Sequence, residues 1–264
     1  RASPRCAAQG DLMSFDQSTP PQPNPAGQVV NVATPTVKPI VTYVLLGLTV
    51  FVFILQSALK LVTGYDLLFI YGGKINQAIL EGEFWRLLTP ALLHSSILHI
   101  AFNMYALFIL GRRLESIHGH WRFLMLYLLS GFGGNVLSFV LSSYPSLGSS
   151  TAIFGLLAAE GVFIFQNRRL FGQRSQAMLS NVLVILFINL LIGFSPGTNI
   201  DNFGHLGGLL AGFMFASLGG PKWVVEGIPP FVSINDSRKK NEVIFAFLVV
   251  LAGFIVMAAI PFFA

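Results

Sequence analysis

Seven long apolar segments constrain this chain more than any other feature. We expect each to be long enough to cross about 30 Å of hydrocarbon, and lipid offers the backbone no hydrogen-bond partners, so such segments must be helical. Only 10% of the 264 residues are charged, against about a quarter in a soluble domain. The sequence therefore predicts an all-α, polytopic membrane protein. The segments span residues 41–59, 88–110, 123–141, 150–166, 178–194, 203–218 and 243–263.

The sixteen Lys and Arg residues divide unevenly between the two sides of such a bundle. With seven spans, the side of the N-terminus receives all of them except Lys60, Lys74 and Arg86, which is thirteen against three. Cytoplasmic loops and their organellar equivalents carry this excess of positive charge. We therefore place the N-terminus in the cytoplasm, stroma or matrix. Membrane topology accounts for the net charge of +5, and no basic stripe with interleaved aromatic residues predicts nucleic-acid binding.

Residues 1–38 differ from the rest of the chain. They are rich in Pro, Gln, Ser and Ala, and Asp11 and Asp16 are their acidic residues. Such a composition buries too little apolar surface to offset the entropy of ordering, which predicts a disordered tail. The chain also begins without Met, so we interpret the tail either as what lies beside a cleaved transit peptide or as an ordinary flexible terminus. Its one cysteine, Cys6, excludes an intrachain disulfide.

Polar side chains within predicted spans mark candidate functional positions, because they are costly in lipid. The second segment contains HSSILHIAFN, with His94, His99 and Asn103, the fourth begins with Ser150, and the sixth contains His205. The alternating direction of the helices places His99, Ser150 and His205 at a similar shallow depth on the side opposite the N-terminus.

A hydroxyl needs a base to act as a nucleophile at neutral pH, and neutral imidazole is the usual one. Ser150 and His205 can supply such a pair. No acidic residue other than Asp201 in the preceding loop lies at a depth that could orient the base, which favours a dyad over a triad.

His99 and Asn103 share a helix face at spacing i, i+4. With the backbone N–H of Ser150 they are suited to stabilise a developing oxyanion. His205, Gly208 and Gly212 share another face, on which the glycines permit close approach of a neighbouring helix. Gly148 would give the backbone the close approach that an oxyanion site needs.

Several motifs in this order resemble those of rhomboid intramembrane serine proteases. They cover most of residues 40–220 and read FWRLLTPALLH, HSSILHIAFN, GRRLESIHG, GSSTAIFGL and GHLGGLLAG. The resemblance implies a six-helix core, here residues 39–220, followed by a linker and a seventh helix over residues 221–264. It also implies cleavage of transmembrane protein substrates within the lipid bilayer and no cofactor. Ser150 would be the nucleophile, His205 the general base, and His99 and Asn103 the oxyanion ligands, with His94 at the other histidine of the second-helix motif.

Thr151 departs from the family pattern, in which glycine usually follows the nucleophile. A β-branched residue adds bulk where the fourth and sixth helices pack, and a small shift of Ser150 would reduce the rate. Alternatively, the hydroxyl of Thr151 bonds back to the preceding turn and is harmless. An inactive relative that binds transmembrane helices is therefore the alternative to a protease.

Other interpretations of these residues have weaker support. Ser149 and Ser150 could cap a helix, and we retain that role for Ser149. A zinc site of His94, His99 and His205 is disfavoured, because a five-residue gap does not place two histidines on one helix face. Glu160 lies nearly three turns beyond Ser150, and we expect it to be protonated or paired. A transporter would need paired broken helices in two matching halves, which are absent from the sequence.

The acid-poor tail favours an organelle. The resemblance to the family, together with the C-terminal position of the seventh helix, implies the inner envelope membrane of a chloroplast, with the mitochondrial inner membrane as the alternative. The sequence does not predict the substrate or the oligomeric state.

Overall fold

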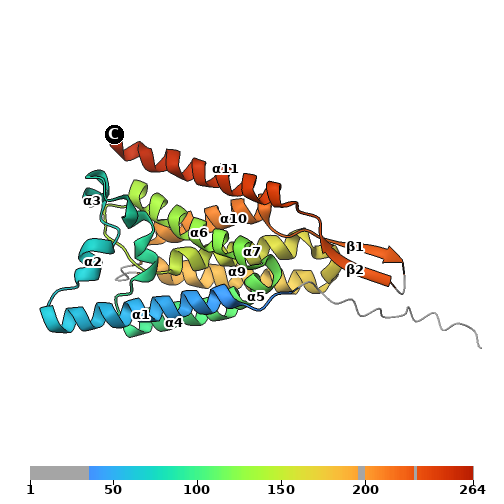
Figure 1. The fold of residues 1–264 in the computed structure, drawn as a ribbon, viewed down its shortest axis with the longest axis horizontal. Coiled ribbons are helices and arrows are strands. Elements are labelled where there is room, and N and C mark those ends of the chain that lie inside the picture. The colour runs from blue at the N-terminus through green and yellow to red at the C-terminus, as the bar shows by residue number, and fades with distance from the viewer. Residues whose placement is uncertain (1–35, 196–199, 229–230, 264) are drawn as a thin grey trace, which may run out of the picture. The chain divides into compact units, whose positions relative to one another are not determined.

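A computed structural model describes residues 36–195, 200–228 and 231–263. The predicted tail therefore lies, up to residue 35, outside the described residues. The described helices, with their bounds, are α1 (Ile40–Thr63), α2 (Leu67–Gly72), α3 (Asn76–Leu80), α4 (Ile97–Ala106), α5 (Arg112–His118), α6 (His120–Leu141), α7 (Ser150–Gln166), α8 (Arg168–Phe171), α9 (Arg174–Gly193), α10 (Asn202–Gly219) and α11 (Lys240–Ala259). Strands β1 (Trp223–Ile228) and β2 (Phe231–Asp236) join α10 to α11 (Figure 1).

Among the described residues, five helical stretches are long and apolar enough to cross a membrane. They are Ile40–Thr63, Ile97–His118, His120–Leu141, Arg174–Gly193 and Lys240–Phe262. Helix α7 is apolar but has only 17 residues, and α10 does not belong to the five. The prediction of an all-α membrane protein is confirmed in its class, and α7 and α10 are the two helices that carry Ser150 and His205.

The second predicted span, 88–110, was misplaced. Residues Phe84–Leu87 and Thr89–Leu92 form two 3₁₀ turns, and the long helix begins only at Ile97. Ser96 sets this start, because its side chain accepts a hydrogen bond from the backbone N–H of His99. A π-helical turn over Leu107–Gly111 then continues the helix into α5.

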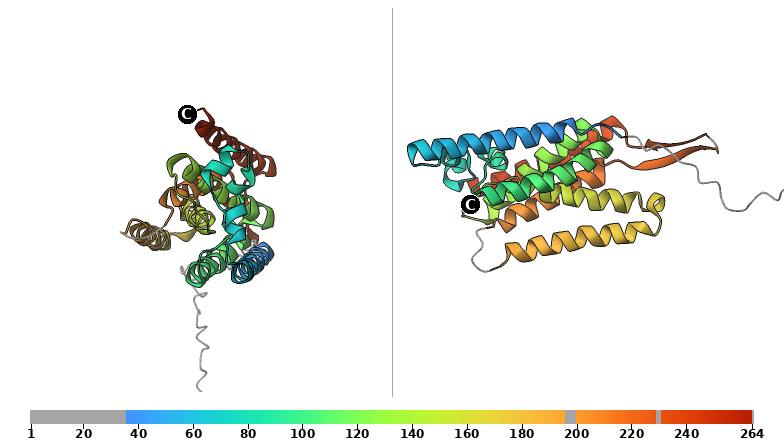
Figure 2. Two further views of the ribbon diagram at one scale, coloured as in Figure 1. Left: turned by 90° about the vertical axis from the view of Figure 1, so that its left-hand side faces the viewer. Right: turned by 90° about the horizontal axis from the view of Figure 1, so that it is seen from below.

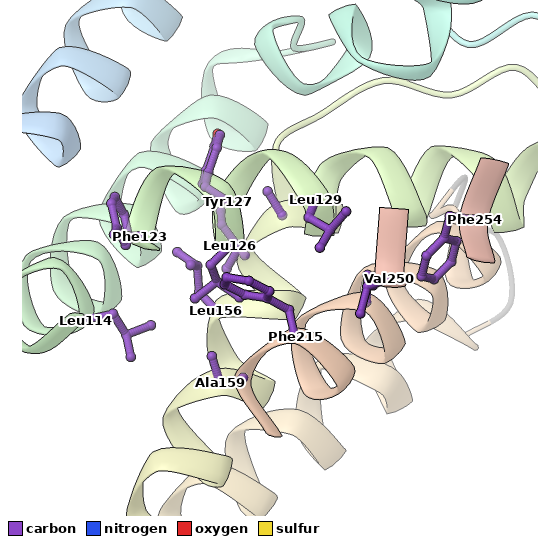
Figure 3. Packing of buried hydrophobic residues seen from close by; sticks show 14 of the residues in the cluster. Leu114, Phe123, Leu126, Tyr127, Leu129, Leu156, Ala159, Phe215, Val250 and Phe254 are labelled. Atoms are coloured by element: carbon purple, nitrogen blue, oxygen red, sulfur yellow. The ribbon is translucent and has the colours of Figure 1, made fainter. Parts of the chain in front are cut away.

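Helices α6, α7 and α10 form the centre of the structure. Twelve of the 17 residues of α7 are buried, and both α6 and α7 pack along α10. Figure 3 shows Leu126, Leu156 and Phe215 meeting between these helices, with Val250 and Phe254 of α11 at the side of the same cluster. This burial places the start of α7 against both α6 and α10.

Helix α9 lies at the edge of the bundle. It runs beside α7 (Figure 2), and only Ser175 and Gly193 of its 20 residues are buried. Its remaining apolar side chains are half-buried or exposed, as expected of a helix with one face on the bundle and the other towards lipid.

Two further features are a β-hairpin in the linker before α11 and an ion pair of Glu160. Strands β1 and β2 pair antiparallel with Trp223 opposite Asp236, within the linker that the sequence analysis left without structure. Glu160 is buried and forms an ion pair with Arg113, whose Nη2 lies 3.0 Å from the carboxylate. The second alternative for Glu160, a paired carboxylate, is therefore what the structure shows.

Candidate active site

Ser150 is the first residue of α7 and lies at the end of the connection from α6. Gly148 makes the turn into this helix with a φ of +127°, a conformation that residues with side chains rarely adopt. Ser150 is partly exposed, whereas Gly148 and Ser149 on its N-terminal side are buried. Its hydroxyl is therefore the accessible one at this helix start.

His205 lies in the first turn of α10. Asp201 is the N-cap of that helix and accepts a hydrogen bond from the backbone N–H of Gly204 at 2.8 Å. Its other carboxylate oxygen accepts a hydrogen bond from the hydroxyl of Ser138 on α6. Asp201 therefore fixes the start of α10, and with it the position of His205, and in the part of the chain that the structure describes no hydrogen bond joins its carboxylate to the imidazole.

Ser150 and His205 meet across the interface of α7 and α10. The Ser150 Oγ lies 2.9 Å from the His205 Nε2. Phe154, one turn further along α7, stacks on the imidazole with ring centroids 4.1 Å apart and an interplanar angle of 12°. The His205 Nδ1 is buried and has no hydrogen-bond partner among the described residues, so the contact is that of a dyad within that part of the chain.

His99 lies against Gly148, two residues before Ser150. A Cβ atom built on Gly148 would lie 2.8 Å from both Cε1 and Nε2 of His99 and 3.8 Å from the Ser150 Oγ. The imidazole therefore rests directly against the glycine backbone, and any larger residue at position 148 would displace it. The His99 Nδ1 lies 3.1 Å from the hydroxyl of Ser95, which leaves the Nε2 edge facing the start of α7.

Asn103 follows one turn after His99 and is buried. Its Nδ2 donates a hydrogen bond to the carbonyl of His99 at 3.0 Å. An amide nitrogen carries two protons, so this bond holds the side chain along α4 and engages one of its two donor positions.

His94 does not face the dyad. It is buried before the start of α4, and its Nε2 lies 3.3 Å from the Oγ of Ser149, which is fully buried. The backbone N–H of His94 donates to the side-chain oxygen of Gln56 on α1. Ser149 does occupy the N-cap position of α7, but its side chain makes no capping hydrogen bond, because it turns to His94 instead.

Thr151 fits between two glycines. A Cβ on Gly134 of α6 would lie 2.5 Å from the Thr151 Cβ, and a Cβ on Gly204 of α10 would lie 3.0 Å from the Thr151 Cγ2. The bulk of the threonine therefore fills space that these glycines leave open. Its hydroxyl has no hydrogen-bond partner among the described residues, so the expected bond back to the preceding turn is not formed.

Gly208 and Gly212 lie where α10 meets α7. A Cβ on Gly208 would overlap the carbonyl of Thr151, and a Cβ on Gly212 would overlap the backbone of Gly155. These overlaps show that the two helices approach at backbone distance.

Comparison with models of known protein families shows which family the chain belongs to. A model of the rhomboid domain matches residues 81–222, which is more than half of the chain. The chain belongs to the rhomboid family. The match begins in the loop before α4 and ends just after α10, so it contains every site residue described above, and the chain is an integral membrane protein of mostly helical fold.

Individual relatives agree with this assignment. The rhomboid protease GluP of Bacillus subtilis (strain 168) is 44% identical over 186 residues, which are 70% of this chain and 36% of GluP. RHOMBOID-like protein 5 of Arabidopsis thaliana is 36% identical over 189 residues, 66% of this chain and 60% of that protein. RHOMBOID-like protein 6, mitochondrial, of the same plant is 43% identical over 132 residues, 50% of this chain and 42% of that protein. The chain thus spans less than two thirds of each of these three relatives. Another rhomboid relative from this plant, RHOMBOID-like protein 9, is named chloroplastic.

Three features of the site were not predicted from the sequence. Phe154 was overlooked, although its spacing of four residues from Ser150 puts both on one helix face. The contact between Ser149 and His94 depends on how the loop before α4 packs against the start of α7. The pocket for Thr151 depends on the packing of α6, α7 and α10, and no local pattern indicates either feature.

Proposed function

We propose that this rhomboid is a serine endopeptidase that cleaves transmembrane segments of membrane proteins, with Ser150 as nucleophile and His205 as general base. The observation that carries the proposal is the 2.9 Å contact between the Ser150 Oγ and the His205 Nε2. That distance lies within hydrogen-bond reach of a nucleophile and its base.

The reaction follows from this geometry. As Ser150 attacks the carbonyl of the scissile peptide bond, its proton passes to His205 Nε2, and the imidazolium then gives the proton to the leaving amine. Water next attacks the acyl-enzyme with His205 again as base, which releases the second product and restores Ser150. The stacked ring of Phe154 keeps the imidazole plane in place during both proton transfers.

The oxyanion of each tetrahedral intermediate would be held by the backbone N–H of Ser150 and by the side chains of His99 and Asn103. The contact of His99 with Gly148 supports its part in this set, because it brings the imidazole next to the turn that carries Ser150. Donors fixed by packing need no reorganisation as the charge develops.

Thr151 motivates the second candidate, an inactive rhomboid that binds transmembrane helices without cutting them. The pocket between Gly134 and Gly204 argues for the protease, because the threonine is accommodated there while the Ser150–His205 contact is kept.

The two candidates differ in cleavage and in reactivity of the serine. We expect the wild-type chain in liposomes to cleave a model transmembrane substrate and to react with a fluorophosphonate at Ser150, and Ser150→Ala and His205→Ala to lose both. A wild-type chain as inert as Ser150→Ala towards several substrates and towards the fluorophosphonate would overturn the protease. Activity that appears only in Thr151→Gly would then identify the threonine as the cause.

For the compartment, we propose the inner envelope membrane of a chloroplast, with the mitochondrial inner membrane as the alternative. The acid-poor, Ser- and Pro-containing residues 1–38 support an organelle. Import of the full-length precursor into isolated chloroplasts and mitochondria would distinguish the two, and import into neither would reject both.

A further inference from the structure

Lys74 is a fully buried lysine in the loop between α2 and α3. A buried ammonium group loses its hydration and is tolerated only where hydrogen bonds and opposite charge replace it. The dyad does not use this residue, so its presence needs another explanation.

Four hydrogen bonds tie Lys74 to the connection between α6 and α7. Its Nζ donates to the carbonyls of Ser142 and Tyr144, both at 2.9 Å. Its backbone N–H donates to the carbonyl of Ser146 at 2.9 Å, and its own carbonyl accepts from the N–H of Ser146 at 3.0 Å. One residue thus holds the first half of the segment 142–149, which ends directly before Ser150.

The other contacts of this segment show what Lys74 adds. Ser142 is the C-cap of α6, where unpaired carbonyls and the helix dipole favour a cation. Asn76 donates to the carbonyls of Phe139 and Ser142, and Gly148 donates its N–H to the carbonyl of Pro90. The connection is therefore held at its start by Lys74 and Asn76 and at its end by Pro90.

Filling this space with a charged lysine carries an unfavourable desolvation free energy. Burial lowers its pKa from 10.5 to about 8, although the carboxylate of Asp201 acts in the opposite direction. A methionine of similar length would bury comparable apolar surface without this desolvation. What methionine lacks is a donor for the carbonyls of Ser142 and Tyr144.

We propose that Lys74 is a positioning residue for proteolysis, whose ammonium group anchors the segment 142–149 and thereby places Ser150 opposite His205. The proposal rests on the protease function proposed above. Lys74 acts through the loop and does not touch the reacting atoms.

The test compares Lys74→Met with Lys60→Met in liposomes, using a cleavable transmembrane peptide and a fluorophosphonate. Lys60 is the matched control, because it is exposed and lies on the same side of the predicted topology. We expect Lys74→Met to lose about 10- to 100-fold in kcat, as small misplacements do, with KM within about twofold of wild type, since the substrate site is retained. Fluorophosphonate labelling of Ser150 should slow by the same factor, and Lys60→Met should match wild type.

Two results would overturn the proposal. One is a Lys74→Met chain with wild-type kcat and wild-type labelling. The other is a loss of rate that is seen only at temperatures near the unfolding midpoint of the variant and is absent well below that midpoint, since Lys74 would then only stabilise the fold. If Lys74→Met yields no folded protein, Lys74→Gln, which keeps a polar group but shortens its reach, is tested by the same criteria. A wild-type chain that neither cleaves nor reacts at Ser150 would instead reject the protease function, which keeps the two failures distinct.

Discussion

Two consecutive serines at the start of α7 each contact a histidine, on opposite sides and in different surroundings. Ser149 lies 3.3 Å from His94, and Ser150 lies 2.9 Å from His205. Ser149 is fully buried and His94 is 1% exposed, whereas Ser150 is partly exposed. The same pair of side chains thus occurs once as a fully internal contact and once with a partly exposed serine. Accessibility, rather than residue type, separates the candidate catalytic pair from the structural one.

The largest effect is expected from breaking the Ser150–His205 pair, and breaking the Ser149–His94 pair is the comparison. Ser150→Ala should reduce cleavage by about 10³-fold or more, because it removes the nucleophile. Ser149→Ala should lose less than about tenfold, since it removes one neutral hydrogen bond worth roughly 1 kcal/mol. Initial rates on a transmembrane peptide in liposomes measure both. A folded Ser149→Ala chain as inert as Ser150→Ala would show that the buried pair takes part in the chemistry.

The next largest effect on cleavage is expected where Gly134 of α6 packs against Thr151, next to Ser150. A Cβ on Gly134 would lie 2.5 Å from the Thr151 Cβ and 2.6 Å from the Gly204 carbonyl. Gly134→Ala should therefore shift α7 against α10, lower stability by about 1–3 kcal/mol and reduce cleavage by about 10- to 100-fold. Gly131, on the same helix, is the matched control, because its added Cβ meets only Ala152 and Ala91, at 3.7 and 3.8 Å.

Combining substitutions sharpens this second comparison. Gly134→Ala with Thr151→Gly should recover part of the lost activity, because the contact with Thr151 is relieved while that with the Gly204 carbonyl remains. Rates and unfolding midpoints of the two single variants and the double variant measure the coupling. Equal tolerance of Gly131→Ala and Gly134→Ala would contradict the close packing around Thr151.

A smaller effect is expected from Thr151→Val, which keeps the shape of the side chain between the two glycines. The threonine hydroxyl has no partner within the described ranges, so its removal should leave stability equal or higher and the cleavage rate within about twofold of wild type. A marked loss of activity at unchanged stability would show that the hydroxyl, and not the bulk, matters beside Ser150.

The smallest effect is expected in the pH dependence of stability, through Lys74, which holds the loop before both serines. The pKa of Lys74 in the folded chain, about 8, lies below its ordinary value of 10.5. Between these values the unfolded chain binds the proton and the folded chain does not, so the Lys74 contribution to stability rises with pH. Relative to Lys74→Met, the unfolding midpoint of wild type should therefore increase from pH 8 to pH 10. A constant difference across this range would mean that the lysine is not desolvated.

The sequence predicted some features of the fold and of the candidate site correctly and missed others. Long apolar runs indicated the helices, since lipid leaves a spanning backbone no other structure. The start of the second helix was misplaced by nine residues, because residues 88–93 are mostly apolar, yet Thr89–Leu92 form a 3₁₀ turn that contains Pro90. The β1–β2 hairpin was missed, although its two strands, WVVEGI and FVSIND, are rich in residues that favour strands and are separated by two prolines in the sequence.

By itself, the sequence determined which side chains were available for chemistry and on which helix faces they lie, since both follow from local periodicity. It assigned Ser150 to His205, but it did not indicate that Ser149 contacts His94, how Thr151 is accommodated, or that Lys74 reaches the loop before Ser150. Those outcomes depend on contacts between segments that are distant in the sequence, up to 70 residues apart for Lys74 and Tyr144. The packing of α7 against α6 and α10, and of the loops that carry Lys74 and His94 against residues 142–149, brings such segments together, so the tertiary structure alone decided these outcomes.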